Sequence, residues 1–270
     1  MSQPSNDEAA GTPRIALVTG GGRGIGEAIA RRLAADGARV VVTGRTQADI
    51  ERVAAELNEA RAHGIDNHLA LVADLADRAA TDAFLASLLA AVERVDILVN
   101  NAGIAVSAPL SKVADDSWDR IMEVNATAPF RLCRALIPGM VERKWGRVVN
   151  IASNAGVSGY RYSAAYCASK HALVGMTRAL AVDLARKGVT INAVCPGWVA
   201  TRMVEEATER IASKTGRSQE QALAALASMS PQGRVLDPTE VAHVVAHLVS
   251  DLARGIHGQA LVIDGGQILK

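Results

Sequence analysis

Residues 14–26 read RIALVTGGGRGIG, and this stretch decides the fold. It opens with a short apolar run, which is typical of a buried β-strand. Glycines follow at once, and the helical pattern EAIARRLAADG (27–37) begins directly after them. A glycine-rich turn between a strand and a helix lets bare backbone approach a pyrophosphate at the positive end of the helix. The stretch therefore predicts a dinucleotide-binding β-α unit.

The same alternation of strand and helix continues along the chain. Helical patterns fill residues 48–64, 76–93, 115–143, 165–187 and 238–253. Strands separated by crossover helices pair in parallel, so we expect one α/β domain over residues 14–270. Its fold class is a Rossmann-type, doubly wound, seven-stranded parallel sheet with helices on both faces. The six further strand candidates are ARVVVTG (38–44), HLALVAD (68–74), VDILVNNAG (95–103), GRVVNIAS (146–153), VTINAVCPG (189–197) and GQALVIDGG (258–266).

Residues 202–230 depart from this alternation. They read as two amphipathic helices that break at Thr215-Gly216, with no strand between them. The segment follows the sixth strand, whose carboxyl end lines the ligand crevice of such a sheet. We predict a small helical lid over that crevice, and ordinary packed surface helices are the alternative.

Composition and charge exclude several classes of function. The 270 residues carry 29 basic and 28 acidic side chains, a net charge of +1, with no basic block that would indicate nucleic-acid binding. No stretch is apolar enough for a membrane span, and residues 1–13 read as a disordered tail without a secretion signal. We therefore expect a cytoplasmic protein that binds a small molecule. Three cysteines without a CxxC pair, and His243 with His247 but no third ligand, predict no metal site.

The end of the second strand decides which dinucleotide is expected. An acidic side chain there would bind the ribose hydroxyls of NAD, but the residues are Gly44 and Arg45. Arg45 and Arg23 of the glycine loop can bind a 2′-phosphate, so NADP(H) is the predicted cofactor. Asp74 closes the third strand, where it can accept a hydrogen bond from adenine; a helix N-cap is the alternative.

Tyr166 and Lys170 stand four residues apart on a predicted helix, so both side chains share one face. A nearby ammonium favours the phenolate, and we expect Lys170 to lower the pKa of Tyr166 and ease proton exchange with an alcohol. Ser153 ends the fifth strand, where its hydroxyl can orient a substrate oxygen. Asn125 lies inside a helical pattern where asparagine is mildly unfavourable, which indicates a functional reason for it.

These motifs together resemble the short-chain dehydrogenase/reductase (SDR) family over residues 14–266. The matching motifs are TGxxxGIG at the glycine loop, NNAG at 100–103, YxxxK at 166–170 and PGxxxT at 196–201, with Asn125 and Ser153 between them. The resemblance implies four catalytic residues, Asn125, Ser153, Tyr166 and Lys170, and usually a homotetramer or homodimer. The residues implied to bind the cofactor are Gly20, Gly22, Arg23, Gly24, Ile25, Gly26, Gly44, Arg45, Asp74, Leu75, Asn101, Ala102, Gly103, Tyr166, Lys170, Pro196, Gly197, Val199 and Thr201.

The resemblance also implies how those residues act. Tyr166 gives a proton to a carbonyl oxygen as hydride arrives from the nicotinamide, or takes one from an alcohol in the reverse direction, while Ser153 holds that oxygen. Lys170 binds the nicotinamide ribose, and Asn125 supports a water-linked proton relay to Lys170. Thr201 holds the carboxamide of the nicotinamide.

The sequence defines the substrate less closely than the cofactor. We expect an apolar pocket in which Ser153, Tyr160, Tyr162 and Trp198 contact substrate. The lid resembles that of 3-hydroxybutyrate dehydrogenases, whereas KHALVGMTRAL and INAVCPGWV resemble 3-oxoacyl and polyketide ketoreductases. Polar and cationic side chains hold the free carboxylate in the former group, and at those positions this chain has Ala105, Ala155, Ser163 and Ala207.

An unpaired buried carboxylate is costly, so a 3-oxoacyl thioester or similar β-keto substrate is favoured over a small free acid. The alternatives are another cyclic or aromatic alcohol or ketone and, more remotely, a cofactor-binding regulator without turnover.

Overall fold

The computed structural model describes residues 12–268, so most of the predicted tail, residues 1–11, lies outside the described residues. Its centre is one seven-stranded sheet in the order β3-β2-β1-β4-β5-β6-β7, with every pair parallel. All seven predicted strands are present. They are β1 (Ile15–Thr19), β2 (Arg39–Gly44), β3 (Leu69–Val72), β4 (Ile97–Asn100), β5 (Gly146–Ile151), β6 (Val189–Pro196) and β7 (Ala260–Ile263).

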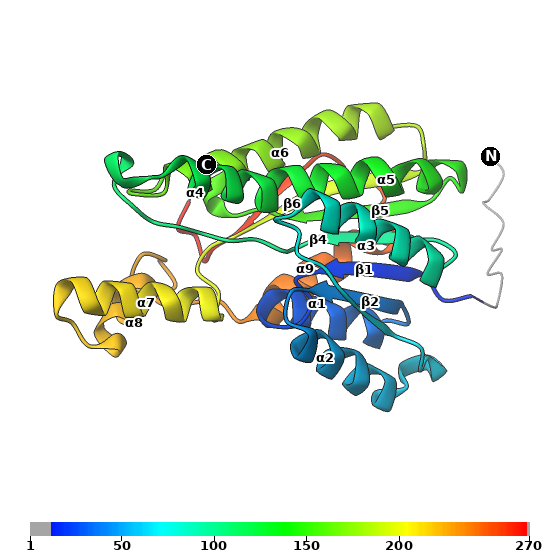
Figure 1. The fold of residues 1–270 in the computed structure, drawn as a ribbon, viewed down its shortest axis with the longest axis horizontal. Helices are drawn as coiled ribbons and strands as arrows, with labels where there is room; N and C mark the ends of the chain where they lie inside the picture. Colours follow the sequence, from blue (N-terminus) through cyan, green and yellow to red (C-terminus); the bar gives the residue numbers. More distant parts are fainter. Residues whose placement is uncertain (1–11, 269–270) are drawn as a thin grey trace.

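Helices cover both faces of the sheet (Figure 1). The main ones are α1 (Gly24–Ala35), α2 (Gln47–Ala60), α3 (Arg78–Ala91), α4 (Asp115–Met122), α5 (Ala128–Glu142), α6 (Ala164–Leu184) and α9 (Pro238–Val249). A π-helix, Glu123–Thr127, joins α4 to α5. Short 3₁₀ turns lie at Ala62–Gly64, Leu110–Lys112, Asn154–Gly156 and Asp251–Ala253.

Two hydrophobic layers hold these helices to the sheet. Successive side chains of a strand point to opposite faces. In β1, Ala16 and Val18 pack with apolar residues of α1, α2 and α9, whereas Ile15 and Leu17 pack with those of α3, α5 and α6. Because both faces are covered, the strands read as continuous apolar runs rather than alternating ones.

The segment predicted as a lid forms two helices, α7 (Arg202–Thr215) and α8 (Gln219–Ala227). Gly216 ends α7 in the left-handed conformation (φ 72°), which explains the predicted break at Thr215-Gly216. Val204, Ala207 and Leu226 form a small apolar cluster between the two helices, against which Trp198 packs. The pair projects from the rest of the molecule at the left of Figure 1.

No helix among residues 12–268 is both long and apolar enough to cross a bilayer.

A chain of buried polar groups links β4, β5 and α6. Asn100 and Asn150 lie opposite each other in neighbouring strands, and Asn100 Nδ2 donates to Asn150 Oδ1 at 2.8 Å. Asn150 Nδ2 donates to Thr177 Oγ1 at 2.8 Å, and that hydroxyl donates to the carbonyl of Leu173. Since buried polar groups are costly when unpaired, this chain fixes where α6 lies on the sheet.

We predict that Asn150→Ala lowers the free energy of unfolding by about 3 kcal/mol, because Asn100 Nδ2 loses its acceptor, and Thr177 a donor, in the core. Urea unfolding at fixed protein concentration measures this difference. Asn67→Ala, at an exposed position, is the matched control and should change stability little. An equal effect of the two substitutions would contradict the assigned role of the polar chain.

Candidate active site

A cavity of about 1150 Å³ opens at the carboxyl ends of the strands. In a doubly wound sheet this is the edge where ligands bind, near the point where the strand order reverses between β1 and β4. Every residue predicted from the sequence to bind cofactor or substrate lines this cavity. Three of the four predicted catalytic residues line it too, and Asn125 is the exception.

The glycine loop forms one wall of the cavity. Gly20 (φ 63°) and Gly24 (φ 55°) adopt backbone conformations that other residues rarely take. A side chain on Gly26 would collide with the Gly20 carbonyl and with Nδ2 of Asn101. Asn101 Nδ2 in turn donates to the carbonyl of Thr19 at 2.8 Å. The NNAG segment thus holds the loop in the shape that exposes the amino end of α1 to the cavity.

Two arginines at this end of the cavity are free to bind a phosphate. Arg23 and Arg45 are exposed and line the cavity, and the side chain of neither makes an ion pair or hydrogen bond within residues 12–268. Their neighbour Arg52 differs, because it bonds to Glu27 and Glu56. A guanidinium pair without carboxylate partners suits a ligand with a terminal phosphate.

Asp74 does not cap the following helix. Asp77 is the N-cap of α3 and accepts a hydrogen bond from Ala80 N, whereas Asp74 Oδ1 accepts only from Ala76 N two residues on. The N-cap alternative for Asp74 is therefore wrong. Asp74 lines the cavity just past the end of β3, and its contact with adenine stays a prediction.

Ser153, Tyr166 and Lys170 meet at the middle of the cavity. Helix α6 carries Tyr166 and Lys170, and Ser153 follows β5. Lys170 is only 4% exposed; its Nζ lies 5.9 Å from the centre of the Tyr166 ring and donates to the carbonyl of Ile151 at 2.8 Å. The YxxxK pair is therefore not an exposed surface pair.

The pKa values of Tyr166 and Lys170 correct the expectation that the tyrosine pKa is lowered. Burial raises the pKa of Tyr166 above its usual range, and a hydrogen bond with Ser153 opposes that shift only in part. Burial also lowers the pKa of Lys170 to about 8. The expected net lowering of the Tyr166 pKa is not found, because burial outweighs the opposing hydrogen bond with Ser153; the Lys170 ammonium donates to the Ile151 carbonyl. Tyr166 is accordingly protonated at neutral pH, as a proton donor must be.

Asn125 lies behind the cavity wall and is fully buried. It sits in the π-helix between α4 and α5, where the backbone departs from regular α-helical bonding. Its side chain pairs with the backbone of Ile104, accepting from N and donating to O at 2.9 Å each, and also donates to Ser169 Oγ. Asn125 therefore fixes the wall segment at Ile104 against α6, and its side chain makes no bond to Lys170.

The PGxxxT motif lines another side of the cavity. Gly197 leaves no room for a side chain, because a Cβ there would meet Asp264 at 2.7 Å. Thr201 precedes α7, and its methyl group lies 3.0 Å from where a Cβ on Gly24 would stand. The start of α7 therefore packs against the glycine loop.

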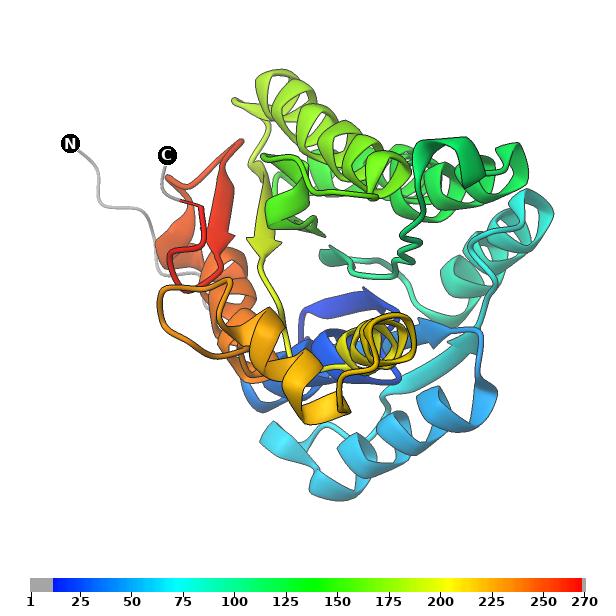
Figure 2. The same ribbon diagram turned by 90° about the vertical axis from the view of Figure 1, so that its left-hand side faces the viewer.

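The far end of the cavity lies between two walls. Residues 104–109 and 160–163 form one wall, joined by a hydrogen bond from Ala108 N to the Tyr162 carbonyl. Helices α7 and α8 form the other wall. Figure 2 shows the two helices toward the viewer, with α7 (yellow) seen nearly end-on. The sequence did not single out Arg210 and Lys214, although both line this end. Their spacing beside Met203, Ala207 and Ile211 would have placed them on one helix face.

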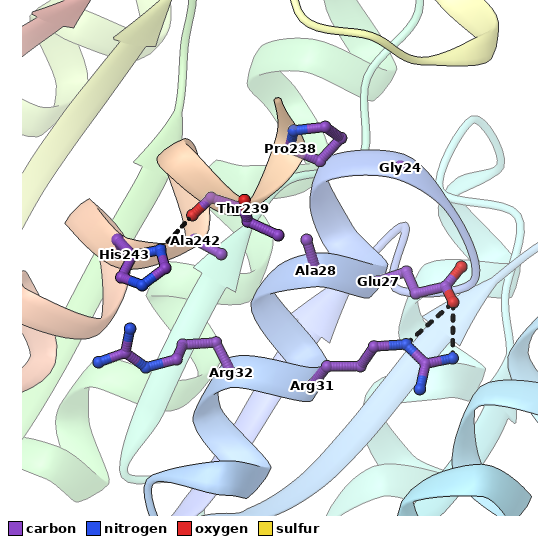
Figure 3. A pocket seen from close by; sticks show the side chains of 9 residues that line it. All are labelled: Gly24, Glu27, Ala28, Arg31, Arg32, Pro238, Thr239, Ala242 and His243. Atoms are coloured by element: carbon purple, nitrogen blue, oxygen red, sulfur yellow. Dashed lines mark hydrogen bonds and ion pairs between the residues drawn. The ribbon is translucent and has the colours of Figure 1, made fainter. Parts of the chain in front are cut away.

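A second hollow, of about 480 Å³, lies between α1 and α9 (Figure 3). It contains none of the predicted catalytic residues; of its charged members, Glu27 and Arg31 bond to each other, and Arg32 pairs with Asp36. The chemistry therefore belongs to the larger cavity.

Comparison with known proteins agrees with this geometry. A family model described as short chain dehydrogenase matches residues 14–212. The chain belongs to this family. Both the family and the fold predicted from the sequence are thereby confirmed.

Three similar proteins illustrate the range of the family. The chain is 42% identical to a protein named as ketoacyl reductase 1 of the granaticin polyketide synthase of Streptomyces violaceoruber, over 93% of this chain and 92% of that one. It is 37% identical to D-beta-hydroxybutyrate dehydrogenase of Cupriavidus necator, over 94% and 98%. A crystal structure of a variant of actinorhodin polyketide ketoreductase with NADPH matches with a TM-score of 0.88 at 39% identity, covering 94% and 97%.

We predict that ketone reduction falls as pH rises through about 8, because Lys170 then loses the charge that stabilises a developing Tyr166 phenolate. The pH profile of kcat/KM measures this, since it reports ionisations of the free enzyme. Lys170→Met should lack this limb and be slower at every pH. A wild-type profile that stays flat to pH 10 would contradict the assignment.

Proposed function

We propose that this protein is an NADP(H)-dependent oxidoreductase that interconverts a ketone and a secondary alcohol, and that it reduces a 3-oxoacyl thioester or similar β-keto substrate. The observation that carries the proposal is the position of Tyr166. Its phenol lies beside Ser153, on the wall of the same cavity that the glycine loop lines. Cofactor and proton donor can therefore meet one substrate.

The site positions the substrate and supplies a proton. A bound NADPH supplies the hydride, and the glycine loop with Arg23 and Arg45 would hold its phosphates. Ser153 donates a hydrogen bond to the ketone oxygen and orients it, while Tyr166 gives that oxygen its proton. Lys170 stabilises the negative charge left on Tyr166, and Asn125 keeps the wall at Ile104 in place.

The side chains that line the cavity favour a β-keto thioester over a small free acid. The four positions where hydroxybutyrate dehydrogenases are expected to bind a carboxylate all line the cavity, and here they are Ala105, Ala155, Ser163 and Ala207. None of these side chains is cationic, so a carboxylate desolvated there would lack an oppositely charged partner, which is costly. The granaticin and actinorhodin relatives are named as ketoreductases, which supports the same substrate class.

Two alternative functions would give different results in these tests. Another cyclic or aromatic ketone would use the same chemistry in the same cavity, and a panel of such ketones tests it. A regulator without turnover is the remaining alternative, and it would bind NADPH tightly while reducing nothing in that panel.

Assembly and location are part of the proposal. As the family resemblance implies, we propose a homotetramer or homodimer in the cytoplasm, with α7 and α8 acting as the lid. Val182 on α6 is 79% exposed and Val262 on β7 is 39% exposed, which supports burial of these faces between copies. Sedimentation velocity would contradict it by showing only monomer.

We predict that Arg45→Ala raises the KM for NADPH about tenfold and leaves the KM for NADH nearly unchanged, because only NADPH carries the 2′-phosphate. Initial rates with each cofactor measure the effect. Arg120→Ala, an exposed arginine on α4 that does not line the cavity, is the matched control. Equal wild-type kinetics with both cofactors would overturn the phosphate assignment.

Tyr166→Phe removes the proton donor and keeps the ring, so we predict a loss of at least about 100-fold in kcat with acetoacetyl-CoA while NADPH still binds. NADPH absorbance follows turnover, and fluorescence titration follows binding. Tyr162→Phe, at a half-exposed position on the same wall, should cost far less. A Tyr166→Phe enzyme with near wild-type kcat would refute the mechanism.

A further inference from the structure

The charges that line the cavity are divided between its two ends. Arg23 and Arg45 are at the glycine-loop end, where the NADPH phosphates account for them. Arg161, Arg210 and Lys214 lie at the lid end, and the proposed cofactor does not account for these. A second group of unpaired cations in one cavity indicates a second anionic ligand group.

Carboxylates of the chain do not neutralise the lid end. Among the cavity-lining residues, Asp49 and Asp74 lie with the glycine loop and β3, and Glu206 bonds to Arg202 at 3.2 Å. Within residues 12–268, the side chains of Arg210 and Lys214 make no ion pair or hydrogen bond. On the facing wall, the guanidinium of Arg161 has only one partner among the described residues, the Tyr162 ring, whose centre lies 5.3 Å from its carbon.

Helix geometry separates these cations from the cofactor. Thr201, just before α7, packs against Gly24 of the glycine loop. At 1.5 Å per residue, Arg210 lies about 13 Å and Lys214 about 20 Å farther along the helix axis. Figure 1 shows α7 running away from the sheet over that length. The cations are therefore out of reach of the loop that would hold the NADPH pyrophosphate.

Between the two ends, apolar side chains of α7 line the cavity, and the charged Arg202 and Glu206 there pair with each other. Met203, Ala207 and Ile211 share the cavity-facing side of α7 with Arg210 and Lys214, and Leu226 and Met229 line the wall beyond them. A short keto acid has its carboxylate next to the ketone and cannot span this surface. A ketone on a long, uncharged arm that ends in a phosphate can.

We propose that Arg161, Arg210 and Lys214 form a phosphate site for a substrate carried on a phosphorylated thioester arm. This inference rests on the proposed ketoreductase function and specifies its substrate class. The phosphate belongs either to coenzyme A or to the pantetheine arm of an acyl carrier protein. The site lies at the open end of the cavity, where such an arm enters.

The test compares two thioesters with the same reacting group. Acetoacetyl-CoA carries phosphates, and the N-acetylcysteamine thioester of acetoacetate carries none. In the double variant Arg210→Ala/Lys214→Ala, the ratio of kcat/KM for the CoA substrate to that for the short thioester should fall about fivefold to tenfold. The loss should appear in KM and shrink at high salt, because exposed charges are screened.

Matched variants separate charge from shape. Arg217→Ala, just past α7 and not on the cavity wall, should keep the wild-type ratio. Arg210→Lys with Lys214→Arg keeps both charges and should restore most of it. An unchanged ratio in the double alanine variant overturns the phosphate site but leaves the proposed function standing. A wild-type enzyme that reduces neither thioester overturns the proposed function and this inference with it.

A third substrate identifies the source of the phosphate. Acetoacetyl-loaded acyl carrier protein presents the pantetheine phosphate without the nucleotide of coenzyme A. If the double alanine variant loses efficiency with both carriers, the site binds the phosphate that they share. If it loses efficiency only with coenzyme A, the site binds the phosphates of its nucleotide.

Discussion

The hydrogen bond from Lys170 Nζ to the Ile151 carbonyl is the contact on which the site depends. It ties the start of α6 to the end of β5. Asn150 makes a second tie to Thr177, two turns farther along the same helix face. With both ties made, the helix can neither rotate nor slide, and Tyr166 is held facing the cavity beside Ser153. Placement of Tyr166, the proposed proton donor, is thus a consequence of buried polar bonds rather than of the YxxxK spacing alone.

Burial sets the protonation states that the mechanism uses. A buried ammonium is costly, which lowers the pKa of Lys170 to about 8, and a buried phenolate is costly too, which raises the pKa of Tyr166. At neutral pH the site therefore holds a neutral phenol above a charged ammonium. That pairing suits reduction, in which Tyr166 gives up a proton and the ammonium stabilises the charge that remains.

Much of the fold could be predicted from the sequence because its signals are local. Apolar runs gave all seven strands, and Gly216 marked the break between α7 and α8. The glycine loop and Ser153 follow strands, so topology places both at the carboxyl edge of the sheet. Features that depend on side-chain direction could not be predicted. Spacing shows that Lys170 shares a face with Tyr166 but not that its Nζ turns to Ile151, and it cannot show that Arg210 faces a cavity.

We propose that one cavity brings NADPH and a ketone together for direct hydride transfer, with Tyr166 supplying only the oxygen-bound proton. The most direct measurement is the origin of the hydrogen on the carbinol carbon of the product. With acetoacetyl-CoA and NADPH deuterated at the transferable position of nicotinamide C4, in ordinary water, direct transfer places deuterium on that carbon. Hydrogen drawn from solvent at that carbon, or NADPH that binds and is never consumed, would contradict it.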